Sequence, residues 1–591
     1  MLIEAVRRLC RRTNDRARLA IVTAIALALL SPCITTKPVA DDLLHRIMLR
    51  QGAGIPALAR RPFDLFSFAS GEPDSARELV EAGVFPWWAD PRAKLAFFRP
   101  LSSLTHWVDY ELWPQSSAMM HVHSLAWFAM LMVVVGAVYR RFIVDRAEMQ
   151  LALLLFAVDD AHAPVVAWIA NRNALISLCL ALPALLFHEK HRRSGSRAAA
   201  CFGPIALASG LAAGETALVA CSYLIAYALF LDRGALRARV QSLLPYGVVV
   251  VLWRVVCAAL GYGVSGSGLY VDPLLHPLGY LRAVCERLPV LALAEVALPW
   301  SDFWEVYPLT IPVLRPVVFA VSVLVMLSLS LLVRKRWREQ RLFRFWTGGA
   351  LLSLLPVCAT FPHDRVLLGA GVGAMSMVAA LLRERLAFPQ RGKMLLFTLG
   401  VIHLVLGPAL GPLRASRVAD LSRVLNAADE SLPASGDIER KTLVLLNPPL
   451  DPLAAYLPIY RAASGRPQPK HLLWLATGVT QLTVMSVDAN TLRVRASEGF
   501  LSTGSQLMLR DLRDPFRQGA VTDLGVVRIR VTALTSDGRP LEIEARFLEP
   551  LQSSTIIWMQ WHKHGYVPVR LAPYGGSVII PAVNVGEALF G

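Results

Sequence analysis

Two adjacent aspartates, Asp41 and Asp42, follow the first apolar segment of the chain. A carboxylate at a membrane–water boundary is costly unless it caps a helix, meets a cation or acts on a substrate. Neighbouring residues of a helix point about a quarter-turn or more apart, so one aspartate can cap the following helix while the other faces a substrate. The pair is therefore a candidate catalytic base, and only one of the two need serve.

Two later segments each combine an arginine with acids or histidines. They supply Asp159, Asp160, His162 and Arg172, and then His363, Asp364 and Arg365. A mixed-charge cluster can bind an anionic phosphate while it keeps a carboxylate ionised. Internal ion pairs between helix ends fit the same spacing. Substrate binding and structural pairing both remain open for these residues.

The composition is that of a membrane protein. Of 591 residues, 55% are hydrophobic, and the mean hydropathy is +0.48. The formal net charge is +17, but the Lys and Arg residues fall in bursts between apolar runs, which does not favour nucleic-acid binding. The eight cysteines show neither a disulfide framework nor zinc-site spacing.

The apolar runs predict about eleven membrane spans, since roughly 17 to 25 apolar residues cross a bilayer. The predicted spans cover residues 19–38, 118–139, 149–167, 173–188, 198–213, 215–231, 243–262, 312–333, 346–361, 366–382 and 394–412. Basic clusters alternate with them and fall on the side of the basic N-terminus, residues 1–18, which is the pattern of cytoplasmic loops. An odd number of spans places the C-terminal region outside the cytoplasm.

Two predicted outer loops are long, covering residues 41–117 and 262–311. The first carries an aromatic stretch typical of helices lying at the level of the lipid headgroups. Its members are Phe85, Trp87, Trp88, Phe97, Phe98, Trp107, Tyr110 and Trp113. The second loop is rich in Gly and Pro.

From residue 414 the composition becomes that of a soluble domain. An amphipathic helix is predicted at about 451–463, and strand alternation follows in Leu482–Val487, Thr491–Ala496, Val526–Leu534 and Leu541–Leu548. Hairpin turns are predicted at 488–490 and 536–538. The fold expected is a polytopic α-helical membrane domain, residues 19–413, followed by an extracytoplasmic mixed α/β, mainly antiparallel β, domain at 414–591.

Several ordered segments resemble the polytopic GT-C glycosyltransferases. The likeness is nearest to the membrane part of the transmembrane and tetratricopeptide repeat-containing O-mannosyltransferases and their bacterial relatives, and it covers roughly residues 19–412. The segments that carry it are Phe98-Arg99-Pro100-Leu101-Ser102 through His121, Leu154 through His162 to Arg172, Gly214-Glu215-Thr216-Ala217-Leu218, and Asp364-Arg365.

The resemblance implies transfer of a sugar from a polyprenyl-phosphate donor to a protein, lipid or glycan acceptor on the outer face of a bacterial inner membrane. It gives the role of base to Asp41 or Asp42, and it places Arg365, with His363 or Arg172, beside the lipid phosphate. No cofactor is required, although Asp159 and Asp160 leave a divalent metal possible. Relatives usually read His-Pro-Val-His where this chain reads Asp159-Asp160-Ala161-His162, so the sugar stays open.

Two other functions fit the same sequence. A catalytically inactive relative would bind lipid-linked glycans or scaffold envelope assembly. A transporter would carry charges along a path at mid-bilayer, whereas the notable acids of this chain gather at one predicted face.

Overall fold

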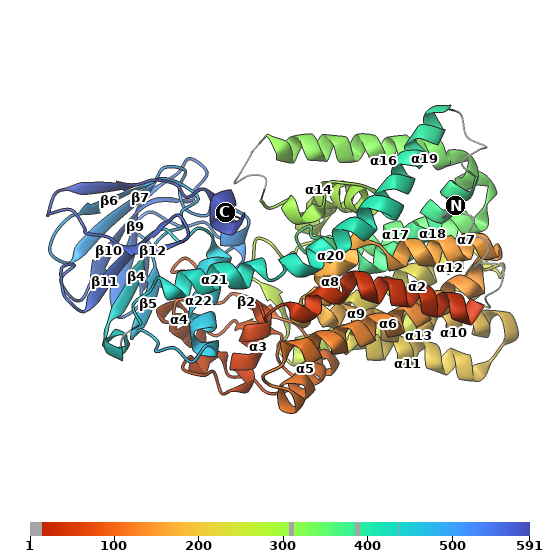
Figure 1. Cartoon of the computed structure of the whole chain (residues 1–591), viewed down its shortest axis with the longest axis horizontal. Helices are drawn as coiled ribbons and strands as arrows, with labels where there is room; N and C mark the ends of the chain where they lie inside the picture. The colour runs from red at the N-terminus through yellow and green to blue at the C-terminus, as the bar shows by residue number, and fades with distance from the viewer. Residues whose placement is uncertain (1–14, 307–312, 385–389, 435, 591) are drawn as a thin grey trace.

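The computed structural model describes residues 15–306, 313–384, 390–434 and 436–590. Figure 1 shows a bundle of helices that lie mostly along the long axis of the molecule, with a β-rich domain at one end. The first fourteen residues of the predicted basic N-terminus and residues 307–311 of the second predicted loop lie outside the described residues.

The bundle contains long apolar helices and shorter broken ones. Its helices are α2 (Asp15–Leu30), α6 (Ser117–Phe142), α7 (Arg146–Ala157), α8 (Ala163–Ala167), α9 (Arg172–Ala181), α10 (Pro183–Ser194), α11 (Arg197–Leu211), α12 (Leu218–Phe230), α13 (Leu236–Ala259), α14 (Pro277–Val296), α16 (Leu314–Glu339), α17 (Arg341–Val357), α18 (Leu368–Arg383), α19 (Gln390–Val401) and α20 (Gly407–Arg417).

Many apolar helices and a β-rich C-terminal domain confirm the predicted fold class. In the described part of the chain, six helices are long and apolar enough to cross a membrane, or seven if the bent pair around residue 158 is one span. Three further apolar helices are shorter, namely 197–211, 215–230 and 368–383. Every predicted span falls on one of these helices or on α17, and the count of eleven stays a prediction.

One helix lies where the sequence predicts a loop. The second predicted outer loop contains α14, whose buried Val290, Leu291 and Leu293 pack toward the bundle. Pro277 stands in the first turn of α14, where a missing N–H costs nothing. Pro289 lies inside the helix, so the two prolines hide an apolar helical pattern.

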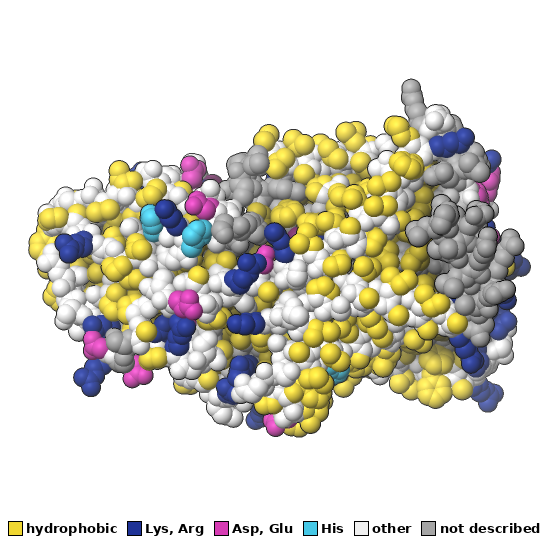
Figure 2. Space-filling model, viewed as in Figure 1, with side chains coloured by type: hydrophobic (Ala, Val, Ile, Leu, Met, Phe, Trp, Pro, Cys, Tyr) yellow, Lys and Arg dark blue, Asp and Glu magenta, His cyan; other side chains and the backbone are white. Residues whose placement is uncertain are grey.

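Basic side chains gather at the end of the bundle away from the β-rich domain, beyond a broad apolar band (Figure 2). Ion pairs join the helix ends there: Arg192 lies 2.7 Å from Asp232, and Arg383 lies 3.0 Å from Asp145. The clusters that the sequence assigns to one side of a membrane therefore meet at one end of the structure.

The first predicted outer loop forms a compact layer next to the β-rich domain. It contains α3 (Asp41–Leu49), β1 (Ser67–Ser70), α4 (Pro73–Glu81), β2 (Lys94–Ala96) and α5 (Pro100–Leu112). β2 pairs with β1 and also with β3 (Gly263–Ser265), which follows α13, both antiparallel. This small sheet joins the two regions predicted as outer loops.

Helix α5 buries its polar side and exposes its apolar side. Ser102, His106 and Asp109 are fully buried, while Leu104 and Leu112 are 39% and 65% exposed. Such an inverted pattern is expected for a helix whose apolar face lies in lipid at the membrane surface. Of the aromatic stretch of the first loop, Trp107 is 36% exposed, as expected for an interfacial position, whereas Trp87 and Trp88 are buried.

The described part of the C-terminal domain holds two sheets and three α-helices. Its elements are α21 (Asp420–Glu430), β4 (Thr442–Leu445), α22 (Asp451–Ala463), β5 (His471–Trp474), β6 (Leu482–Ser486), β7 (Thr491–Ala496), β8 (Val521–Asp523), β9 (Val527–Leu534), β10 (Pro540–Phe547), β11 (Ile556–His562), β12 (Gly565–Pro568), β13 (Ser577–Ile580) and α23 (Val585–Phe590). The six-stranded sheet, in the order β13-β6-β7-β10-β9-β8, is antiparallel throughout. The second sheet, β12-β11-β4-β5, is mixed, because β4 pairs parallel with β11 and β5.

The first loop and the C-terminal domain share one hydrophobic core. Trp87 and Trp88 are buried in it, and their indole N–H groups donate to the carbonyls of Leu475 at 2.9 Å and Gln506 at 3.3 Å. Trp474 donates in return to the carbonyl of Gly83 at 3.0 Å. The two regions are therefore one packed unit, residues 41–117 and 414–590, which we call the ectodomain after the orientation proposed below.

We predict that Trp88→Ala destabilises the whole ectodomain by about 3–5 kcal/mol, the usual cost of truncating a large buried aromatic side chain. Limited proteolysis of the purified protein in detergent should then cleave the C-terminal domain faster, although the substitution lies in the first loop. Trp107→Ala is the matched control, because Trp107 faces outward from α5. Equal cleavage rates for Trp88→Ala and wild type would refute the shared core.

Candidate functional site

Asp41 and Asp42 open helix α3 at the junction between the bundle and the ectodomain. The preceding residue, Ala40, has a φ of 44°, so the chain turns sharply out of the first apolar helix before α3 begins. Helix α3 packs against α22 of the C-terminal domain. The two aspartates thus point into different surroundings from neighbouring positions in the chain.

Both carboxylate oxygens of Asp42 accept hydrogen bonds from backbone N–H groups. Its Oδ2 accepts from the N–H of Val39 at 3.0 Å, and its Oδ1 accepts from the N–H of Ala170 at 2.7 Å. The residue is 1% exposed. Both oxygens are occupied, so Asp42 ties α3 to the segment after α8 and has no oxygen directed at a substrate.

Only one carboxylate oxygen of Asp41 accepts a hydrogen bond from a described residue. The phenol of Tyr456, on α22, donates to Oδ1 of Asp41. No hydrogen bond from a described residue reaches Oδ2, and the residue is half-buried. Of the two predicted candidates for the base, Asp41 is the one whose geometry allows it to accept a proton.

The surroundings of both carboxyl groups disfavour the ionised form. Burial raises the pKa of Asp41 above its usual range, against the hydrogen bond from Tyr456 and the charges of Arg365 and Arg99, which lower it. Burial also raises the pKa of Asp42 to about 7. A carboxyl group with a raised pKa is a better general base near neutral pH than an ordinary aspartate.

Arg365 lies within electrostatic reach of Asp41 and forms no ion pair with any described residue. It lies in a short turn, η7 (Asp364–Val366), that precedes α18. Its guanidinium stacks on the rings of Trp168 at 5.1 Å and Phe361 at 5.5 Å. These contacts orient a planar cation and leave its N–H groups for an anion.

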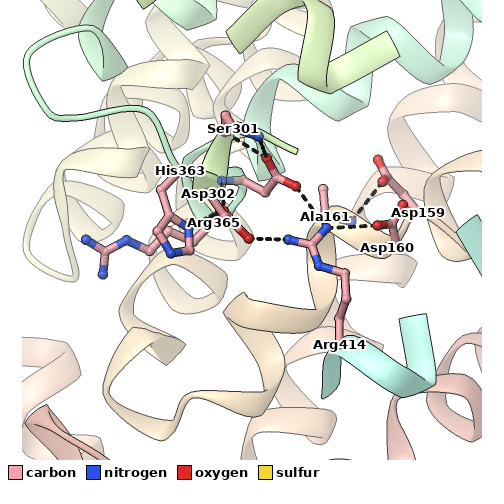
Figure 3. A network of polar contacts seen from close by, with 9 residues as sticks. Asp159, Asp160, Ala161, Ser301, Asp302, His363, Arg365 and Arg414 are labelled. Atoms are coloured by element: carbon pink, nitrogen blue, oxygen red, sulfur yellow. Dashed lines mark hydrogen bonds and ion pairs between the residues drawn. The ribbon is translucent and has the colours of Figure 1, made fainter. Parts of the chain in front are cut away.

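A second cluster surrounds Arg414, at the end of α20 (Figure 3). The guanidinium pairs with Asp160 at 2.8 Å, Asp364 at 2.8 Å and Asp302 at 2.5 Å. It also stacks on Trp300 at 4.4 Å. Three carboxylates occupy this arginine, so it is fixed in place and is not available to a ligand.

His363 lies between Asp302, a partner of Arg414, and the backbone of Arg365. Its Nδ1 lies 2.8 Å from Oδ1 of Asp302 and 3.2 Å from the backbone nitrogen of Arg365. Figure 3 shows the side chain of Arg365 extending away from the Arg414 cluster. The cluster therefore anchors the turn from which Arg365 projects.

The two acids next to His363 differ in charge. Burial raises the pKa of Asp302, but His363 and Arg414 outweigh it, and the net pKa lies below the usual range. Burial and the neighbouring charge of Asp302 raise the pKa of Asp364 to about 6. Asp302 is accordingly the ionised partner of Arg414 and His363. Asp364 also accepts hydrogen bonds from the backbone N–H and from the hydroxyl of Ser301.

Three predicted site residues have other neighbours than the sequence suggests. Arg172, expected beside Asp159 and Asp160, is instead fully buried and paired with Asp109 at 2.5 Å. Asp109 lies on α5, which packs against α9, the helix that begins at Arg172. Arg172 thus has no free face for a phosphate.

His162 and Asp159 also have structural partners. His162 is buried between the rings of Phe128 and Phe156, with centroids 5.5 and 4.5 Å away. Asp159 caps the short turn that follows it by accepting from the N–H of Ala161 at 3.0 Å. Neither contact points to a substrate, and Asp160 is held by Arg414.

Four residues with central positions were not predicted as site residues, namely Arg414, Asp302, Tyr456 and Asp109. Arg414 had a usable signal, because an arginine at the presumed outer end of a span breaks the positive-inside pattern just as Arg365 does. Asp302 stands in the second predicted outer loop beside Trp300. Tyr456 carried no signal, since nothing in its helix indicates a contact 415 residues away.

Among the described residues, no group of three or more His, Cys, Asp and Glu has the geometry to hold a metal ion. The carboxylates of Asp160, Asp302 and Asp364 converge, but the cation at their centre is Arg414. Metal dependence of the reaction stays a prediction.

The chain was compared with known proteins. No protein-family model and no curated protein matches it. Among solved structures, it is similar to the oligosaccharyltransferase AglB of Archaeoglobus fulgidus in complex with an inhibitory peptide and a dolichol-phosphate, at 11% identity and a TM-score of 0.41. That match covers 78% of this chain and 64% of AglB, and the apo form gives 10% identity and a TM-score of 0.43.

A second similar structure is ArnT of Cupriavidus metallidurans bound to undecaprenyl phosphate, at 13% identity and a TM-score of 0.35, covering 77% of this chain and 89% of ArnT. Both proteins are GT-C glycosyltransferases. The likeness concerns the fold and does not extend to individual residues.

We predict that Arg414→Met destabilises the protein by about 3 kcal/mol, because it leaves the buried Asp364 and the partly buried Asp160 and Asp302 without this cation. Thermal unfolding in detergent should show a lower Tm. Arg423→Met is the control, since Arg423 pairs with Asp420 on the surface and is 77% exposed. An unchanged Tm for Arg414→Met would show that the cluster does not hold α20 in place.

Proposed function

We propose that the protein is a membrane glycosyltransferase that moves a sugar from a polyprenyl-phosphate donor to an acceptor hydroxyl on the outer face of the membrane. One observation carries the proposal: Asp41, whose Oδ2 receives no hydrogen bond from a described residue, lies within electrostatic reach of Arg365, an arginine with no ion pair to a described residue. A base and a phosphate-binding cation are the two groups that this transfer needs.

In the proposed reaction, Asp41 takes the proton of the acceptor hydroxyl through Oδ2. The acceptor oxygen attacks the anomeric carbon of the sugar, and the bond from that carbon to the phosphate oxygen of the lipid breaks. Arg365 balances the negative charge that develops on the leaving phosphate. A single displacement of this kind inverts the configuration at the anomeric carbon.

The orientation in the membrane is part of the proposal. Basic helix ends gather opposite the ectodomain (Figure 2), and cytoplasmic loops are the ones enriched in Lys and Arg. The ectodomain and the site would then face outward. In the same arrangement, the exposed apolar face of α5, next to α3 and its aspartates, would lie at the outer membrane surface.

We predict that substitutions of Asp41 and Asp42 have different effects. Asp41→Asn should lower transfer by about 10²–10⁴-fold at normal protein levels, the usual contribution of a general base. Asp42→Asn should mainly lower protein stability, by about 1–3 kcal/mol, because an amide cannot accept from both N–H groups. The measurement is envelope glycan analysis in cells that lack the native copy, normalised to the amount of protein.

The wild-type pH profile belongs to the same experiment. Because the base must be ionised, transfer should fall on the acid side at a pH above the 3.8 of an ordinary aspartate. Unchanged glycans in Asp41→Asn, with normal protein levels, would contradict the proposed function.

We predict that Arg365→Ala weakens the binding of undecaprenyl phosphate by about ten- to a hundredfold, the value of a hydrogen bond to a charged group. Native mass spectrometry of the purified protein can measure this affinity. Arg365→Lys should restore part of it, since the charge remains but the planar fork is lost. Arg172→Ala should reduce stability and leave the affinity of the folded fraction unchanged, and equal affinities for Arg365→Ala and wild type would remove this assignment.

A further inference from the structure

The ectodomain places one of its own side chains in the candidate site. Tyr456 lies on α22, in the C-terminal domain, and its hydroxyl donates to Oδ1 of Asp41. The two residues are 415 positions apart in the sequence. The resemblance noted in the sequence ends before this domain, so this contact is a property of the present chain.

Helix α22 is held firmly on both sides of Tyr456. At its start, Oδ2 of Asp451 accepts from the hydroxyl of Ser505 at 2.9 Å. At its end, Arg461 pairs with Asp429 at 2.7 Å, with both side chains almost fully buried. Tyr460, one turn after Tyr456, donates to Asn426 of α21 at 2.9 Å. These contacts fix the position from which Tyr456 reaches Asp41.

The remaining surroundings of Asp41 come from three other segments. The first loop contributes Arg99, whose guanidinium bonds to Glu215 at 2.8 Å and stacks on Phe97 at 4.7 Å. The turn before α18 contributes Arg365, and the segment after α13 contributes Tyr270 near Tyr456. Tyr456 is the group that bonds directly to the carboxylate, so it determines which oxygen of Asp41 remains free.

Resting on the function proposed above, we infer that Tyr456 is a positioning residue for Asp41. Its hydroxyl holds Oδ1, turns Oδ2 toward the acceptor and favours the ionised carboxylate. Transfer therefore requires the C-terminal domain to be seated on α3, and a protein with the bundle alone has an incomplete site.

The substitution Tyr456→Phe tests this inference, because it removes the hydroxyl and keeps the ring. Loss of a donor to the ionised form raises the pKa of Asp41. The protonated fraction can be followed without any substrate: N,N′-dicyclohexylcarbodiimide reacts with protonated carboxyl groups in apolar surroundings, and mass spectrometry quantifies the label on Asp41. In the full-length protein in detergent, the pH midpoint of labelling should rise by about one to two pH units in Tyr456→Phe.

Tyr460→Phe is the matched control, since it removes a hydroxyl from the same helix without touching Asp41. Its labelling midpoint should equal that of the wild type. In cells, transfer by Tyr456→Phe should fall about tenfold near neutral pH and recover as the pH of the medium is raised, because the base is then ionised again. A merely structural role of the hydroxyl would lower protein levels and would not recover with pH.

Two results overturn the inference. One is an equal labelling midpoint for Tyr456→Phe and Tyr460→Phe. The other is full transfer by Tyr456→Phe at every pH while Asp41→Asn is inactive, which leaves the proposed function in place and removes only the role of Tyr456. Normal transfer by Asp41→Asn would instead overturn the proposed function together with this inference.

Discussion

The burial of Trp87 and Trp88 in the core of the C-terminal domain is the contact on which the rest of the arrangement depends. It joins a loop near the start of the chain to a domain at its end, and it leaves little room for adjustment. Gly83 shows how close the two parts come: a Cβ atom at this position would lie 2.3 Å from the side chain of Leu472. Since close-packed interiors resist deformation, this core fixes α22 against α3 and so fixes Tyr456 against Asp41.

Two arginines at the junction, Arg414 and Arg365, differ in whether carboxylates pair with them. Arg414 is surrounded by three carboxylates, and its charge serves to hold α20, the turn at 301–303 and the turn at 364–366 together. Arg365 projects from the last of these turns, and no carboxylate of the described residues pairs with it. One buried arginine is thus fully paired, and the second is oriented by ring stacking, which is the preorganised charge that the proposed phosphate site requires.

Much of the fold was predictable because it depends on local patterns. The predicted bounds of the helix at 451–463 and of the strand at 491–496 match the structure, and both predicted hairpin turns join neighbouring strands. The parallel pairing of β4 with β5 and β11 was missed, because the short strand β5 carries only four residues and its register is set by partners far along the chain. Helix α14 was missed because its two prolines interrupt the pattern.

The candidate site was predictable as a set of residue types and not as a set of contacts. Asp41, Asp42 and Arg365 stood out as charges that topology alone does not explain. The sequence could not indicate which of the two aspartates is the better candidate for the base. The difference depends on the N–H of Ala170, 128 residues from Asp42, and on the hydroxyl of Tyr456. The partner of Arg172 was beyond sequence reasoning for the same reason, since Asp109 reaches it only through tertiary folding. Determining the structure of the full-length protein with undecaprenyl phosphate would test the site most directly. The phosphate should lie within hydrogen-bonding distance of Arg365 and face the free oxygen of Asp41, whereas a phosphate bound among the basic helix ends opposite the ectodomain would contradict it.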